Sequence, residues 1–199
     1  MSVFDSITSL LSSGSRSSSF PFSGVGSLLL SDISGFSAEA PEVSPLDVIE
    51  ALGRILELER RYIQESGGFM PYTGVGEVVL AVWGSLGSSR SHAELAVETG
   101  RKILAESQRV QAETGFSLEV RIAVTTGRMT VNTIGGRPQV FGAPFTTAQR
   151  LLELPVVRRS HLLCTSETLE LIYSRPPSDV IATIRGCAGQ DVPVFEFTL

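Results

Sequence analysis

The segment from residue 28 to residue 36 reads LLLSDISGF, an apolar strand that ends at a carboxylate and continues into a glycine-containing turn. Asp32 at the end of such a strand offers hard oxygen ligands of the kind that Mg²⁺ prefers. The backbone N–H groups of the turn and of a following helix can bind phosphate oxygens. An aspartate after a strand is also a common turn or helix-cap residue, so its role depends on the rest of the chain.

The composition is that of one globular domain. The chain has 199 residues, of which 42% are hydrophobic and 19% charged, and no apolar run approaches the roughly 20 residues of a membrane span. Without a signal peptide at its start, we expect a cytoplasmic protein. Cys164 and Cys187 lie among apolar residues, which favours buried, reduced thiols. Isolated His92 and His161 argue against a histidine metal site, and the net charge of −5 argues against a nucleic-acid-binding surface.

The apolar pattern predicts an N-terminal segment, residues 1–23, and one folded domain, residues 24–199. The N-terminal segment combines a short helical pattern with a serine-rich stretch at 12–19, and a docked helix and a disordered lead-in remain alternatives. Within the domain we expect helices at 45–66, 91–113 and 145–154, and strands at 28–32, 69–73, 78–83, 118–124, 129–134, 162–164, 180–185 and 194–198. A Thr-Gly turn is expected between the strands at 118–124 and 129–134. This order predicts an α+β fold with a ferredoxin-like βαββαβ core and a C-terminal extension.

Three later segments, together with residues 28–36 and in the same order, resemble the class III nucleotidyl cyclases. The segment 72–83, YTGVGEVVLAVW, resembles the family's hairpin, in which a Gly-Asp pair precedes an apolar strand. The segment 122–135, IAVTTGRMTVNTIG, resembles its strand, Thr-Gly turn and second strand. The segment 141–151, FGAPFTTAQRL, is similar to the family's glycine and following helix, which carries Asn and then Ala-x-Arg. The resemblance implies conversion of a nucleoside triphosphate to a 3′,5′-cyclic nucleotide and pyrophosphate, with Mg²⁺ or Mn²⁺.

The resemblance also implies a metal site. It places metal ligands at Asp32, at the Ile33 carbonyl and at Glu77, where the family usually has Asp. Glu keeps the charge and the oxygen ligands but is one methylene longer, and an exposed turn residue remains the alternative at this position. The resemblance further places phosphate-binding N–H groups at Ser34, Gly35 and Phe36.

Three residues match cationic or polar positions of the family. Arg150 matches the arginine that stabilises the transition state from the opposite subunit, and its planar charged fork suits a phosphate; a solvent-facing arginine is the alternative. Arg185, followed by Gly186, resembles the late Lys-Gly pair that contacts the triphosphate. Thr146 stands where the family has Asn and keeps only a hydroxyl donor.

The base-reading positions depart from the family. Adenylate cyclases have a Lys–Asp pair where this chain has Thr73 and Gln139, and guanylate cyclases use another polar set. We therefore expect an enzyme that is not adenine-specific. Thr and Gln offer donors and acceptors that suit a pyrimidine, and Tyr72 would fill the space left by a smaller base. The stand-alone chain resembles the bacterial pyrimidine cyclases that make cyclic UMP or cyclic CMP in antiphage signalling.

Two functions remain open. An inactive cyclase-homology domain would act as a nucleotide-binding or regulatory module, and the ferredoxin-like fold by itself supports no function. We favour the enzyme because Asp32, an acid at position 77 and Arg150 are all retained. In the family the metal carboxylates come from one subunit and the base-reading and arginine residues from the other, so the resemblance implies a head-to-tail homodimer with its sites at the interface.

Overall fold

The computed structural model describes residues 22–34, 44–73, 78–84, 91–115, 118–156 and 160–197. The ferredoxin-like core consists of β1 (Phe22–Ser34), α2 (Pro45–Glu65), β2 (Phe69–Thr73), β3 (Val78–Gly84), α3 (His92–Thr114) and β4 (Glu119–Ile134). The C-terminal extension adds β5 (Arg137–Phe141), α4 (Ala143–Leu152), β6 (His161–Thr165), α5 (Ser166–Leu169), β7 (Ser178–Arg185) and β8 (Asp191–Phe197). The expected α+β fold with a βαββαβ core is therefore confirmed. The predicted N-terminal helix and serine-rich stretch lie outside the described residues, and β1 begins at Phe22, two residues before the predicted domain start.

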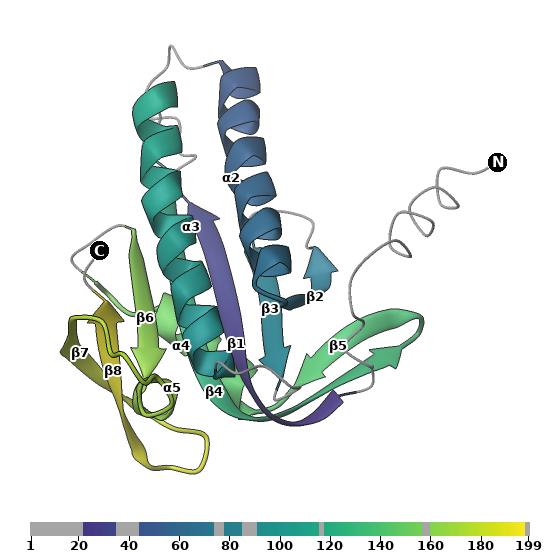
Figure 1. Cartoon of the computed structure of the whole chain (residues 1–199), viewed down its shortest axis with the longest axis vertical. Coiled ribbons are helices and arrows are strands. Elements are labelled where there is room, and N and C mark those ends of the chain that lie inside the picture. Colours follow the sequence, from purple (N-terminus) through teal and green to yellow (C-terminus); the bar gives the residue numbers. More distant parts are fainter. Residues whose placement is uncertain are drawn as a thin grey trace.

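One sheet runs through the molecule in the order β2-β3-β1-β4-β6-β8-β7, and β5 pairs with the far part of β4. Helices α2 and α3 lie side by side along one face of the sheet (Figure 1), where they pack against Leu29 and Ile33 of β1. Helix α4 packs on the opposite face against Leu28 and Leu30. Successive side chains of a strand point to opposite faces, so β1 contributes to both cores.

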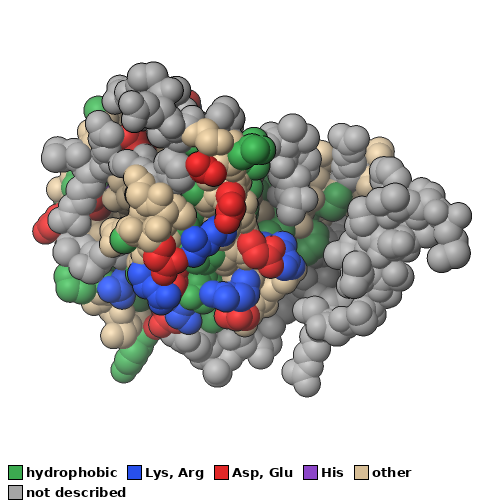
Figure 2. All heavy atoms as spheres, turned by 90° about the horizontal axis from the view of Figure 1, so that it is seen from above, with side chains coloured by type: hydrophobic (Ala, Val, Ile, Leu, Met, Phe, Trp, Pro, Cys, Tyr) green, Lys and Arg blue, Asp and Glu red, His purple; other side chains and the backbone are tan. Residues whose placement is uncertain are grey.

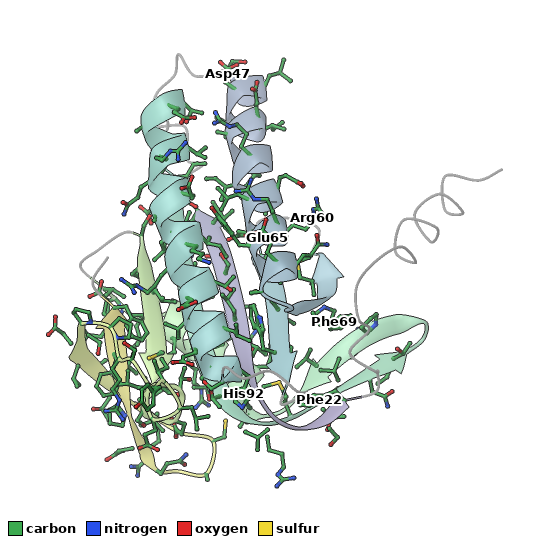
Figure 3. The ribbon with its side chains drawn as sticks, in the orientation of Figure 1. Phe22, Asp47, Arg60, Glu65, Phe69 and His92 are labelled. Atoms are coloured by element: carbon green, nitrogen blue, oxygen red, sulfur yellow. The ribbon has the colours of Figure 1, made fainter. Side chains whose placement is uncertain are left out.

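The two long helices begin and end close to where the sequence predicts. Ser44 caps α2 by accepting a hydrogen bond from the Leu46 N–H at 3.3 Å, and Ser91 caps α3 by accepting one from the Glu94 N–H at 3.0 Å. Gly115 ends α3 in the left-handed conformation, with φ of 75°. His92, at the start of α3 near the sheet (Figure 3), lies with its Nδ1 atom 2.9 Å from Ser27 Oγ.

The predicted Thr-Gly turn within residues 118–134 is wrong, because β4 is one continuous strand of 16 residues. Its pairing with β1 continues through Thr126 and Gly127, which face Ser27 and Gly26. A Cβ atom at Gly127 would lie 3.1 Å from Pro144 Cγ. The glycine thus allows α4 to approach the strand closely rather than forming a turn.

The C-terminal half holds three further corrections. Helix α4 begins at Ala143 rather than at 145, because Gly142 precedes it with φ of 142° and Pro144 suits a first helical turn. Strand β5 was not expected; it contains Pro138 and pairs with β4 alone, at an edge where a proline is tolerated. Cys164 is buried as predicted, but Cys187 is exposed because it lies between β7 and β8.

Candidate active site

Asp32 projects from β1 away from the two long helices. Its neighbours Ser31 and Ile33 face α2 and α3, so the alternation of the strand sends Asp32 to the other face. Its side chain is 20% exposed. On β3, Asp32 lies opposite Val78.

Arg121 lies directly across from Asp32 on β4 and forms an ion pair with it through its Nη2 atom. The Arg121 side chain is 32% exposed, so the pair is accessible to a ligand. Arg121 is not among the site residues predicted from the sequence. The signal was present, because Glu119 and Arg121 alternate with apolar residues in an otherwise buried strand and so face one side together.

A cavity of about 690 Å³ opens in front of the Asp32–Arg121 pair. Its wall is formed by apolar residues and by the amides Gln139 of β5 and Gln149 of α4. The complete lining comprises Leu30, Asp32, Pro71, Val78, Leu80, Arg121, Pro138, Gln139, Val140, Phe145, Gln149, Leu152 and Glu153. A mainly apolar pocket with a few convergent polar groups is typical of a small-molecule site.

The structure brings the predicted residues together in two groups. Asp32 and Gln139 line the same cavity of one chain, whereas the resemblance assigns the base-reading position to the opposite subunit. Arg150 instead lies beside Arg185, donating a hydrogen bond from Nη1 to the Arg185 carbonyl oxygen at 2.7 Å, while Arg185 forms an ion pair with Asp191 at 2.7 Å. Neither arginine lines the cavity that holds Asp32.

The remaining predicted residues differ in how far the structure describes them. Ile33 is buried, Ser34 ends β1 opposite Glu119, and Thr146 is exposed on α4. The backbone of Tyr72 and Thr73 belongs to β2, but their side chains lie outside the described part, as do Gly35, Phe36 and Glu77 altogether.

The carboxylate of Asp32 is suited to serve as one ligand of a divalent cation. Its carboxylate is accessible from the cavity and already has the Arg121 cation beside it. Among the described residues no three His, Cys, Asp or Glu side chains form a metal-binding group. A complete site would need further oxygen ligands, for which the resemblance offers the Ile33 carbonyl and Glu77.

A second hollow, of about 610 Å³, lies between α2 and α3 away from Asp32. Figure 2 looks down on this end of the molecule and shows Arg and Glu side chains interleaved. Several of them neutralise one another: Arg54 pairs with Glu113 at 2.5 Å, and Arg109 pairs with Glu106 at 3.3 Å. Exposed pairs of this kind contribute little to stability, and we assign this surface to solvent contact.

Glu59 of α2 is buried on the face of the sheet opposite the cavity. It accepts a hydrogen bond from Ser31 Oγ at 2.5 Å through Oε1. Burial is the main cause that raises the pKa of Glu59 from 4.5 to about 7, and the Ser31 hydrogen bond lowers it by less. Because protonation of Glu59 is favoured in the folded state, the free energy of unfolding should fall as pH rises from 4.5 to about 7.

We expect Glu59→Gln to remove this pH dependence. The shift of the wild-type pKa corresponds to about 3 kcal/mol of stability lost across that window, and an amide does not ionise. Urea unfolding at several pH values, followed by the fluorescence of the single tryptophan, Trp83, measures it. Glu57→Gln, on the exposed side of α2, should keep the wild-type slope. A wild-type stability that stays level between pH 4.5 and 7 would contradict the assignment.

The chain belongs to the adenylate and guanylate cyclase catalytic domain family, whose model matches residues 21–172. It is thus a nucleotidyl cyclase by family, and class III cyclases in general use divalent metal ions. A sequence search found no match among characterised proteins. No helix in the described part of the chain is long and apolar enough to cross a membrane.

Solved cyclase structures have the same fold. The adenylyl cyclase CyaB from P. aeruginosa is 19% identical, with a TM-score of 0.76 over 89% of this chain and 95% of that chain. The guanylyl cyclase Cya2 is 24% identical, with a TM-score of 0.71 over 88% and 92%. The guanylate cyclase domain of RhGC from Catenaria anguillulae, solved in complex with GTP, is 19% identical, with a TM-score of 0.72 over 87% and 96%.

Proposed function

We propose that this chain converts a nucleoside triphosphate to a 3′,5′-cyclic nucleotide and pyrophosphate at the cavity in front of Asp32. The observation that carries the proposal is the placement of Asp32 and Arg121 at one wall of a cavity of about 690 Å³ that also holds Gln139. An inactive domain is not favoured, because the chain belongs to a catalytic family and keeps an accessible carboxylate at this position.

The reaction requires stabilisation of the negative charge that develops at the α-phosphate and on the leaving pyrophosphate. Asp32, the Ile33 carbonyl and Glu77 would hold Mg²⁺ or Mn²⁺, which supplies a Lewis acid for the 3′-hydroxyl and the phosphate oxygens. The N–H groups of residues 34–36 would bind phosphate oxygens. Arg121, which pairs with Asp32, would turn its guanidinium to a phosphate, where a planar charged fork binds well.

Arg150 and Arg185 act on the nucleotide held by the other subunit of a homodimer. Both lie outside the Asp32 cavity of their own chain and are joined by the hydrogen bond from Arg150 to the Arg185 carbonyl. Exposed apolar side chains support a subunit interface. Val78, which lines the cavity, is 43% exposed, and Phe141 of β5 is 50% exposed. In the dimer Arg150 stabilises the transition state, Thr146 donates a hydroxyl, and Arg185 contacts the triphosphate.

The base is read by Gln139 together with Thr73, while Tyr72 fills the remaining space. Gln139 lines the cavity, and its amide both donates and accepts hydrogen bonds. A Lys–Asp pair that would match adenine is missing from the two positions. We infer a pyrimidine substrate, UTP before CTP, and a role of the cyclic product in antiphage signalling.

Incubation with each of the four ribonucleoside triphosphates and Mn²⁺ tests both the reaction and the base. We expect cyclic UMP to form fastest, with kcat/KM for UTP about tenfold above that for ATP, because an unmatched buried polar group costs roughly 1–3 kcal/mol. Gln139→Ala should reduce this preference, whereas Gln108→Ala on the exposed side of α3 should leave it intact. Stronger competition by ATP than by UTP would reverse the assignment of the base.

A further inference from the structure

Glu59 occupies a place where an apolar residue would be expected. Its side chain is fully buried, and Ile55 and Ile63, one helical turn away on either side, are fully buried too. Within the described part of the chain its Oε2 atom has no hydrogen-bond partner. Burying a carboxyl group with only one partner costs free energy, so stability does not explain this residue.

The single hydrogen bond of Glu59 reaches the strand next to the metal ligand. Ser31 and Asp32 are neighbours on β1 but point to opposite faces, Ser31 toward α2 and Asp32 toward the cavity. Asp32 pairs with Val78 of β3 and with Arg121 of β4, and the β1–β4 pairing continues to Ser34. The bond from Ser31 to Glu59 adds a contact from α2 directly beside the Asp32 position.

We propose that Glu59 is a positioning residue, which holds the end of β1 through Ser31 and thereby fixes the place of the Asp32 carboxylate in the cavity. This inference rests on the proposed function, because it gives Asp32 the metal-ligand role. Within the described residues, burial and the Ser31 hydrogen bond are the two influences on the Glu59 carboxyl group. The anchor is thus a local contact between one helix and one strand.

A cyclisation assay separates positioning from a merely structural role. Glu59→Met should be more stable than wild type at pH 8 because a buried carboxyl is removed, yet kcat should fall about tenfold and the Mn²⁺ concentration for half-maximal activity should rise about tenfold. Glu59→Gln, whose amide oxygen still accepts from Ser31, should stay within about twofold of wild type. Ser31→Ala should match Glu59→Met, and the double variant should lose no more, since both remove the same contact.

Hydrogen exchange followed by mass spectrometry tests the anchor without any activity. Peptides covering 28–34 should exchange about tenfold faster in Ser31→Ala and Glu59→Met than in wild type, while peptides of α3 stay unchanged. Ser107→Ala is the matched control, because Ser107 is fully buried on α3 and its Oγ has no partner within the described residues.

The outcomes of the two experiments are distinguishable. Unchanged exchange at 28–34, or full activity with unchanged Mn²⁺ dependence in Glu59→Met, would overturn the positioning role while leaving the cyclase assignment standing. A wild-type protein that cyclises no triphosphate would count against the proposed function, and the exchange of 28–34 would still decide whether Glu59 anchors the strand.

Discussion

Asp32→Asn should lower metal-dependent cyclisation by at least about 100-fold, because it removes the charge that holds the metal while keeping the size of the side chain. Stability should change by less than about 1 kcal/mol, since the ion pair with Arg121 is partly exposed to solvent. Turnover at saturating Mn²⁺ and binding of a non-cyclisable triphosphate analogue measure the two parts of the effect. Both the turnover and the binding of the analogue should decrease.

The matched control is Asp47→Asn in the first turn of α2, an exposed carboxylate that does not line the cavity. It should leave turnover and triphosphate binding unchanged. If Asp32→Asn turned over at the wild-type rate, the assignment of this cavity as the catalytic site would be wrong.

Arg150→Ala should also inactivate the protein, by at least about 100-fold, because the transition state loses a bidentate cation. Mixing it with Asp32→Asn should restore activity to about a quarter of wild type, since random pairing makes half of the dimers mixed and each mixed dimer has one intact site of two. The physical reason is that Arg150 does not line the Asp32 cavity within one chain.

The control for this experiment mixes two variants of the same half-site, Asp32→Asn and Glu77→Ala. No pairing of these chains gives a site with both carboxylates, so the mixture should stay inactive. Subunit exchange is verified by mass spectrometry of isotopically labelled chains. Exchange without recovery in the Asp32–Arg150 mixture would contradict the shared site.

Local signals in the sequence were sufficient to predict the core of the fold. Ser44 and Pro45 define the start of α2, and Ser91 and Gly115 define both ends of α3, because capping depends on a few adjacent residues. The position of Asp32 at the end of an apolar strand likewise identifies a residue that lies in the wall of the cavity.

Features that depend on pairing between distant strands were not predictable in the same way. Gly127 suggested a turn, although its partner Gly26 and the approach of Pro144 keep it in a strand. The role of Arg121 beside Asp32 can be recognised only from the strand register, which puts the two residues opposite each other. The contact of Glu59 could not be predicted from the sequence for the same reason, because its partner Ser31 is 28 residues away.

Arg121 supplies Asp32 with a counter-ion from within the chain, so charge balance at the end of β1 is built into the polypeptide. Many small metal-binding domains fold only together with their metal, because the site does not form without it. Here the Asp32 carboxylate is balanced before any metal binds, so we expect the fold not to depend on a metal. Depletion of divalent cations should therefore stop catalysis while leaving the protein folded.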